Sequence, residues 1–434
     1  ETELMLWDFK VSKGDFYAVP AGHIGVAAGL EARRETFSED RDPRLDGTLT
    51  FTDLAGQVSQ SDVMGVSYTP DSHGARNVYS AFLELAVPVV SPEMNVPFVQ
   101  SIDVQLAGRI ENYSLFGTVG APKVAMAYRP NGWLMFRGAW SQGFRAPNLL
   151  QLHQPDFERS NARRDYAACA VQLAIGAIPN LTTSNDYCTS EDRIESRSGN
   201  KDLKAEDSEN LSFGIVLEPE LWSNKYGDLT FTVDYWKIRQ ENLVGIFGGT
   251  NQLIMDYYLR QIGSTNPNVI RAAPDAQQIA DGTAAGLAPV GTLLSIKDDY
   301  LNLQPRESEG LDFRLYYSLR DTPLGDWRLS INASQKLKLF QEASEQHQVL
   351  LDALADGVIS GVNVGGVEDL IRRNGRPEWK VTASLTWDLG PWTAGWYSSY
   401  VSEFYDTSAT FVDSDQYWIV DDWLTHNLYV QYQL

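Results

Sequence analysis

The feature that most constrains the fold is a two-residue alternation of oily and polar side chains, clearest in WLMFRGAWSQGFRAP, Trp133–Pro147. In an extended strand, successive side chains point to opposite faces of the sheet. One face would carry Leu134, Phe136, Gly138 and Trp140, and the other Met135, Arg137, Ala139 and Ser141. The first face suits contact with lipid and the second suits a polar interior, so the pattern favours a strand that crosses a membrane.

The same alternation recurs about thirteen times along the chain. The segments that carry it are 5–11, 26–33, 79–87, 102–111, 123–129, 134–141, 211–217, 228–235, 311–320, 328–336, 380–387, 392–396 and 428–434. We expect these strands to exceed the five or six residues usual in globular sheets and to reach the 9 to 11 that cross a bilayer at a tilt. No run approaches the roughly 18 apolar residues of a membrane-spanning helix. The predicted fold class is therefore all-β, an antiparallel transmembrane β-barrel.

The connections between these segments alternate between short and long. The short ones are 12–23, 91–97, 129–132, 218–228, 321–326 and 389–391, and the long ones are 37–76, 146–207, 244–301, 341–378 and 405–420, with 113–117 as one brief member of the second set. Transmembrane barrels have this asymmetry, with tight turns on one side and large loops outside. Within the long connections, 252–261 and 345–354 have helical spacing, which predicts helices packed among the loops.

Aromatic residues give a further indication of a membrane strand. We expect Trp and Tyr to gather at strand ends, where an amphipathic ring would lie at the level of the lipid headgroups. The residues assigned to this role are Trp7, Trp133, Trp222, Tyr226, Trp236, Trp327, Trp379, Trp392 and Trp423.

The charge and the motif content exclude several functions. A net charge of −22 would repel a polyanion, so no nucleic-acid partner is predicted. The acidic segment 38–46 lacks the ligand order of a calcium loop, and the five histidines are dispersed without a zinc-binding spacing. No nucleotide-binding or hydrolase motif occurs. We predict no catalytic residue, metal site or cofactor, and we do not expect an enzyme.

The chain has two cysteines, Cys169 and Cys188, inside one polar connection. Their proximity and the absence of a CxxC motif favour a disulfide that closes a local loop over two unrelated thiols. Such a bridge suits an exported protein that passes through an oxidising compartment.

The arginines on the polar faces need a partner in a wet interior. They include Arg109, Arg137 and Arg314. We expect them to pair with inward Asp and Glu rather than to act as ligands for an anion.

The strand count itself carries an implication about completeness. A single-chain bacterial barrel closes with an even number of antiparallel strands, whereas about thirteen are counted here. We therefore expect part of a barrel, in which the final strand HNLYVQYQL needs a further segment to cover its edge. The first residues contain no basic region followed by an apolar core, so they do not form a signal peptide.

Four segments resemble the TonB-dependent receptors of Gram-negative outer membranes. They are Val19–Glu35, Ser101–Pro130, Trp133–His153 and Gly199–Pro219. The most specific match is the combination of GFRAP, which comprises Gly143, Phe144, Arg145, Ala146 and Pro147, with LKAEDSEN at 203–210. The second half of the chain, including RESEGLDFRLYYSL at 306–319, is similar more loosely.

The resemblance implies a fold and a set of partners. Members have a plug inside a 22-stranded barrel and a segment that engages TonB, so residues 1–434 would be a barrel region of about 13 strands, roughly the eighth to the twentieth, without the plug or the last strands. The implied location is the outer membrane of a Gram-negative bacterium, in contact with its lipid. The implied function is TonB-energised uptake of a large scarce ligand, such as a siderophore, cobalamin or an oligosaccharide.

Ligand contact would then fall on the long loops, where Tyr166, Tyr187, Tyr257 and Tyr258 are candidates. For each of them, packing between surface loops is the alternative explanation. Two other functions stay open at this point. A passive porin-like barrel would share the strands without a plug, and a soluble β-sandwich used for binding or adhesion would pack its apolar faces together.

Overall fold

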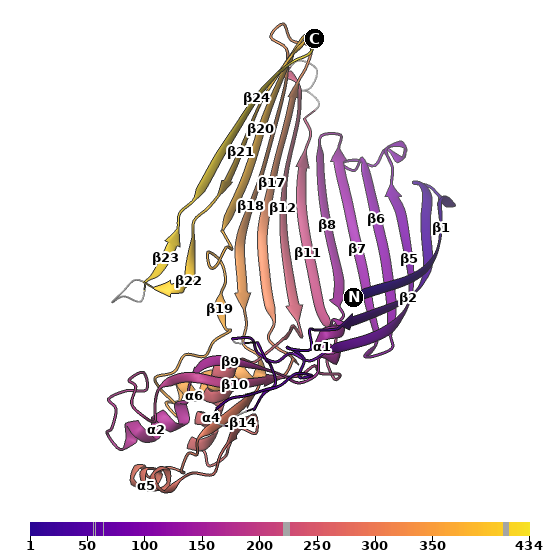
Figure 1. The fold of residues 1–434 in the computed structure, drawn as a ribbon. Coiled ribbons are helices and arrows are strands. Elements are labelled where there is room, and N and C mark those ends of the chain that lie inside the picture. The colour runs from indigo at the N-terminus through magenta and orange to yellow at the C-terminus, as the bar shows by residue number, and fades with distance from the viewer. Residues whose placement is uncertain (55, 57, 64, 220–225, 411–415) are drawn as a thin grey trace.

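The computed structural model describes residues 1–54, 56, 58–63, 65–219, 226–410 and 416–434. It has two parts: one large curved antiparallel sheet, and a compact unit of helices and short strands beyond one end of that sheet (Figure 1). The second part is built from the long connections between neighbouring strands of the first.

The large sheet follows the chain in sequence order. Its main path is β1 (Thr2–Val19), β2 (Gly22–Glu39), β5 (Ser72–Val90), β6 (Ser101–Tyr113), β7 (Gly117–Asn131), β8 (Leu134–Arg145), β11 (Glu206–Leu217), β12 (Asp228–Glu241), β17 (Arg306–Leu319), β18 (Asp326–Gln341), β20 (Trp379–Leu389), β21 (Trp392–Val401) and β24 (Trp423–Tyr432), and β19 (Glu368–Asp369) pairs with β18. Neighbours on this path are antiparallel throughout. Among the described residues β1 pairs only with β2 and β24 only with β21, so the sheet is open.

Each strand of the main path lies on one of the thirteen segments that the alternation predicts, which confirms the all-β antiparallel fold. One predicted connection, 12–23, is wrong. Strand β1 continues to Val19 and stays paired with β2 as far as Val19 opposite Gly22, so the turn is only Pro20–Ala21. The alternation fades after Val11, but hydrogen bonding to β2 continues past an irregularity between Lys13 and Tyr17. Backbone pairing therefore extends a strand beyond its oily pattern.

The two faces of the sheet differ as predicted. Oily side chains such as Leu211 and Phe213 stand about half exposed on one face, at 48% and 51% of their full accessible area. The other face carries small and polar side chains that line a shallow hollow of about 630 Å³ extending from β1 to β12. A hollow across so many strands marks the concave face of a curved sheet. Arg137 of β8 reaches Asp234 of β12 on this face, across the whole width of β11.

The aromatic assignment is confirmed only in part. Trp133, Tyr226, Trp327, Trp379, Trp392 and Trp423 lie at or beside strand ends. Trp7 and Trp236 lie inside their strands, so their assignment to strand ends is wrong. Trp236 is on the concave face, where Gly310 leaves room for its ring: a Cβ at Gly310 would lie 2.4 Å from the indole. Trp222 lies outside the described residues.

The packed part, which we call the loop unit, combines three long connections: 146–205, 242–305 and 342–378. Its elements are β9 (Phe157–Arg164), β10 (Ser190–Arg197), β14 (Val269–Arg271), β15 (Leu293–Lys297), α2 (Tyr166–Ala174), α4 (Gly249–Gln261), α5 (Ala276–Ala285) and α6 (Glu345–Ala355). The strands form a mixed sheet in the order β14-β15-β10-β9, in which β10 and β15 are parallel. Helices α4 and α6 confirm the two predicted loop helices. Where described, no helix has the length and apolar character to span a membrane.

The remaining elements are short. They are α1 (Leu149–His153), which packs against β5, the 3-10 helix η1 (Pro92–Met94), and the strand pairs β3 (Phe51–Thr52) with β4 (Val58–Ser59), β13 (Val244–Gly245) with β16 (Leu301–Asn302), and β22 (Phe404–Thr410) with β23 (Tyr417–Val420).

The loop unit has a hydrophobic core of its own. Ile254 of α4 and Leu350 of α6 are fully buried there beside Cys169 and Cys188. The two cysteines form the predicted disulfide, which joins α2 to the segment before β10. A hydrophobic core and a disulfide together make these connections an ordered unit rather than a set of independent loops.

Candidate ligand-binding surfaces

The GFRAP motif lies where β8 leaves the sheet for the loop unit. Arg145 forms an ion pair with Glu206, the first of the two glutamates in the LKAEDSEN segment, and Glu206 is only 3% exposed. Register explains the combination of motifs, because Gly143 is opposite Ser208 and Arg145 is opposite Glu206 on the neighbouring strands. A side chain at Gly143 would press on the Ser208 hydroxyl at 2.9 Å. The GFRAP and LKAEDSEN segments therefore contact each other where the large sheet meets the loop unit.

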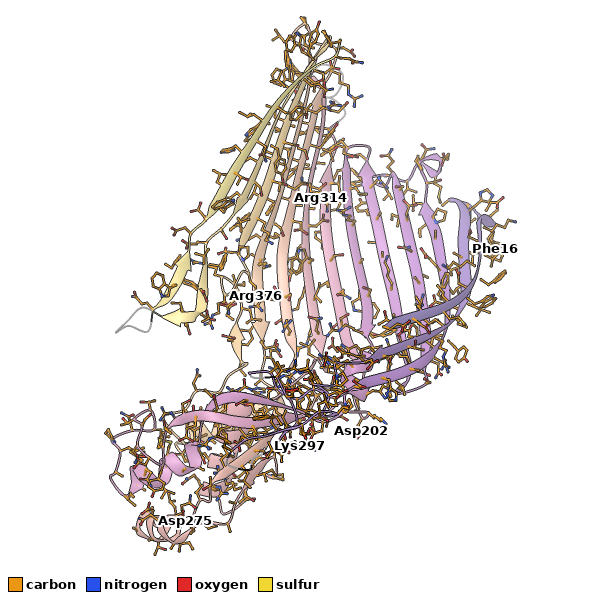
Figure 2. All side chains as sticks on the ribbon, viewed as in Figure 1. Phe16, Asp202, Asp275, Lys297, Arg314 and Arg376 are labelled. Atoms are coloured by element: carbon orange, nitrogen blue, oxygen red, sulfur yellow. A yellow bond between two sulfur atoms is a disulfide. The ribbon has the colours of Figure 1, made fainter. Side chains whose placement is uncertain are left out.

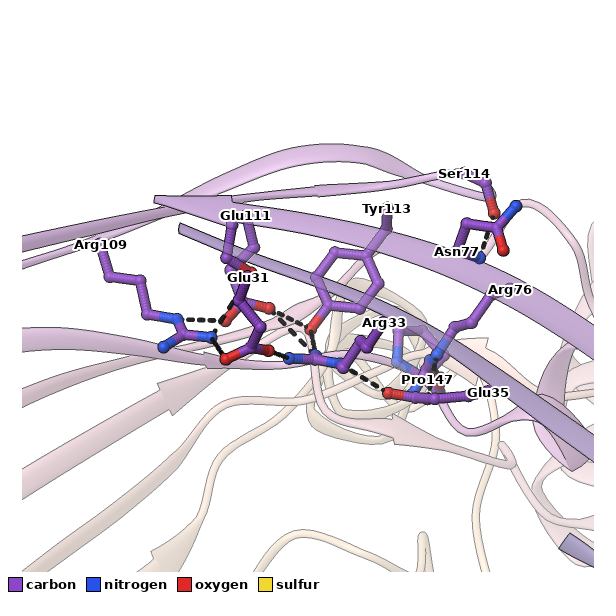
Figure 3. A network of polar contacts seen from close by, with 11 residues as sticks. Glu31, Arg33, Glu35, Arg76, Asn77, Arg109, Glu111, Tyr113, Ser114 and Pro147 are labelled. Carbon is purple, nitrogen blue, oxygen red and sulfur yellow. Dashed lines mark hydrogen bonds and ion pairs between the residues drawn. The ribbon is translucent and has the colours of Figure 1, made fainter. Parts of the chain in front are cut away.

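A network of ion pairs covers the concave face of the first strands (Figure 3). It consists of Glu31, Arg33 and Glu35 on β2, Arg76 on β5, and Arg109, Glu111 and Tyr113 on β6. Arg33 is central: it donates to Glu31 at 2.7 Å and to Glu35 at 2.8 Å. It also reaches Glu111 at 3.2 Å and the Tyr113 hydroxyl at 2.9 Å.

The outer members complete this network. Arg109 binds Glu111 and also donates to Glu31 at 3.3 Å. Arg76 donates to the backbone carbonyl of Pro147 at 2.6 Å, which ties the GFRAP segment to the sheet. Three guanidinium groups thus face three carboxylates, and the charge of this region is balanced within the sheet itself. The alternation predicts which of these side chains face inward, but not that Arg76 would reach the GFRAP segment.

The concave face of the later strands has a different arrangement, which we call the cation ladder. Its members are Arg306 at the loop end of β17, Lys336 on β18 opposite Gly310, Lys380 on β20 in one row with Ser334 and Asp312, and Arg314 in one row with Asn332 and Thr382. None of the four forms an ion pair with any residue that the structure describes. Arg306 is held instead by the Gln341 side-chain oxygen, at 2.7 and 2.9 Å.

The ladder corrects one expectation about the inward arginines. Pairing with inward acidic residues is confirmed for Arg109 and Arg137 and is wrong for Arg314. The reason is register, since the residues opposite Arg314 on the two neighbouring strands are Thr232 and Asn332, which carry no charge.

A second cavity lies in the loop unit. It has a volume of about 240 Å³ and is lined by residues of the three segments 165–193, 275–281 and 290–293. Tyr187 is 44% exposed and lines it, whereas Tyr257 is 7% exposed within the core and Tyr166 and Tyr258 pack against that core. The structure thus brings one of the four candidate tyrosines to a cavity. Ligand contact by these residues stays a prediction.

Buried polar groups join the long connections of the loop unit. Arg271 lies between Asp165, the N-cap of α2, and Asp256 of α4, with bonds of 2.7 Å and 2.9 Å to their oxygens. All three side chains are at most 7% exposed. Removing one partner of such a cluster typically costs about 3 to 5 kcal/mol, because a buried charge is left unpaired. The sequence held no signal for this cluster, since its members are far apart along the chain.

A buried histidine joins another pair of connections. His347 of α6 is 1% exposed and contacts Asn251 of α4 and the hydroxyl of Ser344. Burial lowers the pKa of His347, because removal from water disfavours the charged imidazolium. Over the described part of the chain, no cluster of three His, Cys, Asp or Glu side chains could hold a metal ion.

Comparison with known proteins identifies the family. Residues 7–434 match the model of the TonB dependent receptor-like β-barrel. No curated protein matches the chain.

Solved structures share the fold at low sequence identity. One is the siderophore receptor PirA from Acinetobacter baumannii, with a TM-score of 0.57 and 13% identity over 99% of this chain and 48% of that one. Another is a mutant of the ferric enterobactin receptor PfeA from Pseudomonas aeruginosa, with a TM-score of 0.59 and 14% identity over 100% of this chain and 46% of that one. The chain thus spans about half the length of these receptors. It belongs to the TonB-dependent receptor family, whose β-barrel model matches residues 7–434.

Proposed function

We propose that this chain is the barrel portion of a longer outer-membrane receptor that takes up a siderophore-type iron chelate with energy delivered through TonB. The observation that carries the proposal is the match to the family's barrel over residues 7–434. The structures of similar fold are described as siderophore, ferric enterobactin and ferripyoverdine receptors, which favours an iron chelate over cobalamin or an oligosaccharide.

The two faces of the sheet support a place in the outer membrane. The oily convex face would contact lipid, and the concave face, with its ion pairs and polar side chains, would line a wet lumen. A soluble sandwich would instead bury its oily faces against a second sheet. Within the described residues no second sheet covers Leu211 or Phe213, which are about half exposed.

The proposal also names partners that lie outside residues 1–434. A plug domain would occupy the lumen, and a segment of the same protein would engage TonB, so the chain would not transport a ligand alone. Its loop unit would face the outside of the cell. Tyr187 and the hollow of about 240 Å³ beside it would meet the arriving ligand.

The test is uptake of radioactive iron by iron-starved cells of the source organism, with and without an intact gene for this protein. Disruption should abolish uptake from one iron chelate, and loss of TonB or addition of an uncoupler should do the same. Uptake that persists without TonB would identify a passive porin-like barrel. Unchanged iron uptake, with loss of cobalamin or oligosaccharide uptake instead, would reassign the ligand.

A further inference from the structure

Part of the connection between β18 and β20 covers the disulfide of the loop unit. We call residues 344–366, which include α6, the strap. Four apolar side chains of the strap are buried in the core that also holds both cysteines: Leu350, Ala353, Ile359 and Val364. A side chain on Gly361 would contact Leu181 at 3.5 Å, and the carbonyl of Leu181 lies 4.0 Å from the Cys188 sulfur. The strap is therefore part of the cover that keeps both sulfurs out of solvent, at 0% exposure.

One set of buried polar contacts joins the strap to α4. The Nε2 atom of His347 lies 3.3 Å from the side-chain nitrogen of Asn251, and its Nδ1 atom lies 2.6 Å from the hydroxyl of Ser344. The same Asn251 side chain accepts a hydrogen bond from the backbone N–H of Gly365 at 3.1 Å. His347 and Asn251 are 1% and 5% exposed. Together they connect both ends of the strap to α4.

The orientation of the Asn251 amide determines what His347 can do. The amide nitrogen donates to the carbonyl of Phe247 at 2.8 Å and to that of Gly365 at 3.1 Å, whereas the amide oxygen faces the Gly365 N–H. A rotated amide would place its oxygen against two carbonyl oxygens, so the nitrogen is fixed on the side of the ring. Nε2 of His347 thus meets a donor, and it can accept that hydrogen bond only while it carries no proton.

A proton on Nε2 would disturb this arrangement. The new N–H would point at the NH₂ group of Asn251 or compete with it for the Gly365 carbonyl. Burial disfavours the charged ring and lowers the pKa of His347, and this effect outweighs the Gly365 carbonyl, which favours the charged form. The ring also packs edge-on against Phe247, at 4.8 Å between the centroids, and an apolar neighbour gives the charge no compensation.

The charged side chains on the two helices beside the ring are engaged elsewhere or exposed. On α4, Asp256 is held by Arg260 and Arg271. On α6, Glu345 and Asp352 are exposed at the surface. Among the described groups, burial and one backbone carbonyl are what act on the ring. An imidazolium in the packed strap would therefore lack a carboxylate within this part of the chain.

We propose that His347 is a pH-sensitive latch, which holds the strap on the disulfide core near neutral pH and releases it when the ring takes up a proton. Release would separate the strap from α4 and uncover the bridge between Cys169 and Cys188. The ring takes up a proton more readily in the open strap than in the packed one, so opening becomes more favourable as the pH falls below about 6.5. One proton changes the ratio of open to packed strap by at most about tenfold per pH unit.

The latch lies outside the wall of the barrel. Figure 2 shows the loop unit, in which Asp275 and Lys297 are labelled, beyond the end of the sheet that carries Arg314. Because the strap closes on helices of its own unit, the latch requires neither a plug nor a bound ligand. Its contact with the external medium rests on the proposed outward orientation of the loop unit.

The experiment uses the disulfide as a reporter of the strap. The whole protein, purified from its outer membrane, is treated with a water-soluble phosphine at pH values from about 8 to about 5. The phosphine gives two electrons to the bridge and becomes a phosphine oxide with oxygen from water, and the two sulfurs take up protons as thiols. Labelling of Cys169 and Cys188 with N-ethylmaleimide, measured by mass spectrometry, gives the rate. A short peptide with an exposed disulfide corrects for the pH dependence of the reagent.

Two variants and one control isolate the proton on His347. H347Q retains an oxygen that can accept from Asn251 but takes up no proton. S344D places a carboxylate beside Nδ1 and keeps a good N-cap for α6, so it favours the charged ring within the packed strap. The control is H73Q, which removes an exposed histidine of β5.

In the native protein and in H73Q, the corrected rate of reduction should rise below about pH 6.5, by up to about tenfold per pH unit. H347Q should show no such rise. S344D should stay protected at about pH 5.5, where the native bridge is reduced, because its carboxylate compensates the charge of the ring.

Two results would overturn the latch. One is a native rate that does not depend on pH, or one that rises in H347Q as it does in the native protein. The other is reduction of S344D at about pH 5.5 as fast as in the native protein, which would place the proton on another group. Fast reduction of H347Q at every pH would support the latch if S344D stays protected and would overturn it if S344D does not. Iron uptake plays no part in these measurements, so the proposed function can fail or hold separately.

Discussion

The two halves of the concave face differ in whether their cationic side chains have acidic partners. On β2, β5 and β6, Arg33, Arg76 and Arg109 are each neutralised by carboxylates of the same sheet. On β17, β18 and β20, the cation ladder has no such partners among the described residues. The difference teaches that an inward-facing arginine can form ion pairs within the sheet or stay without an acidic partner in the described chain, and that the residues opposite it in register decide which.

The largest effect should come from the convex side of the ladder wall. Leu315→Arg should destabilise the sheet by about 2 to 4 kcal/mol, if Leu315 faces mid-bilayer, because it places a charge in hydrocarbon. Arg314→Gln, one residue away on the other face, should change stability by less than about 0.5 kcal/mol. Denaturant unfolding from lipid vesicles measures both, and equal costs at the two positions would contradict the assignment of faces.

The next prediction compares the stability contributed by the ion-pair network on β2, β5 and β6 with that contributed by the cation ladder. Glu111 is 5% exposed and accepts bonds from Arg33, Arg109 and Tyr113, so Glu111→Ala leaves several donors without a partner. We expect a loss of about 1 to 3 kcal/mol in unfolding free energy. Lys380→Ala, which breaks no ion pair within the described chain, should lie within about 0.5 kcal/mol of the native protein. A larger loss of unfolding free energy in Lys380→Ala than in Glu111→Ala would contradict this prediction.

A pH change tests whether the loops above the ladder stay packed. The pKa of His347 is lowered by burial, so an opened loop takes up a proton more readily than the packed one. Stability of the loop packing should be complete above about pH 6.5 and should fall as the pH drops below it, by at most about 1.4 kcal/mol per pH unit.

Hydrogen exchange of the α6 amides at pH 7.5 and 5.5, corrected for intrinsic rates, measures this change. His347→Gln should remove the difference in protection between the two pH values. A difference that persists in this variant would mean that another group causes it.

The smallest effect concerns folding at the ladder itself. Lys336→Gln should change the unfolding free energy by no more than about 0.5 kcal/mol, because Lys336 has no ion pair with a described residue. Thermal or denaturant unfolding checks this. A clear loss of stability would show that Lys336 contributes to folding through a partner, and Lys336 would then no longer count as a member of the cation ladder.

Much of the sheet could be predicted because the alternation of apolar and polar residues is a local pattern in the sequence. The alternation around Phe136 or Leu315 depends only on neighbouring residues, and it locates all thirteen strands of the main path and both faces. Where the alternation fades, as after Val11, the prediction ended β1 too early, because pairing with β2 rather than side-chain pattern extends it.

The site could be predicted less well because it depends on register between distant segments. The alternation predicts that Arg314 points inward, but whether a carboxylate faces it depends on β12 and β18. In the same way, the contact of Arg271 with Asp165 and Asp256 joins segments that no local pattern relates. The disulfide between Cys169 and Cys188 was an easier prediction, because the chain offers only one pair.

The central claim is that the first wall neutralises its own charge, whereas the later wall leaves the charge of Arg314, Lys336 and Lys380 unpaired. An experimental structure of the whole protein, purified from its outer membrane without ligand, tests this most directly. It should keep the pairs of Arg33, Arg76 and Arg109, and should show no carboxylate within about 4 Å of Arg314, Lys336 or Lys380. Carboxylates from elsewhere in the protein seated on all three would contradict the claim.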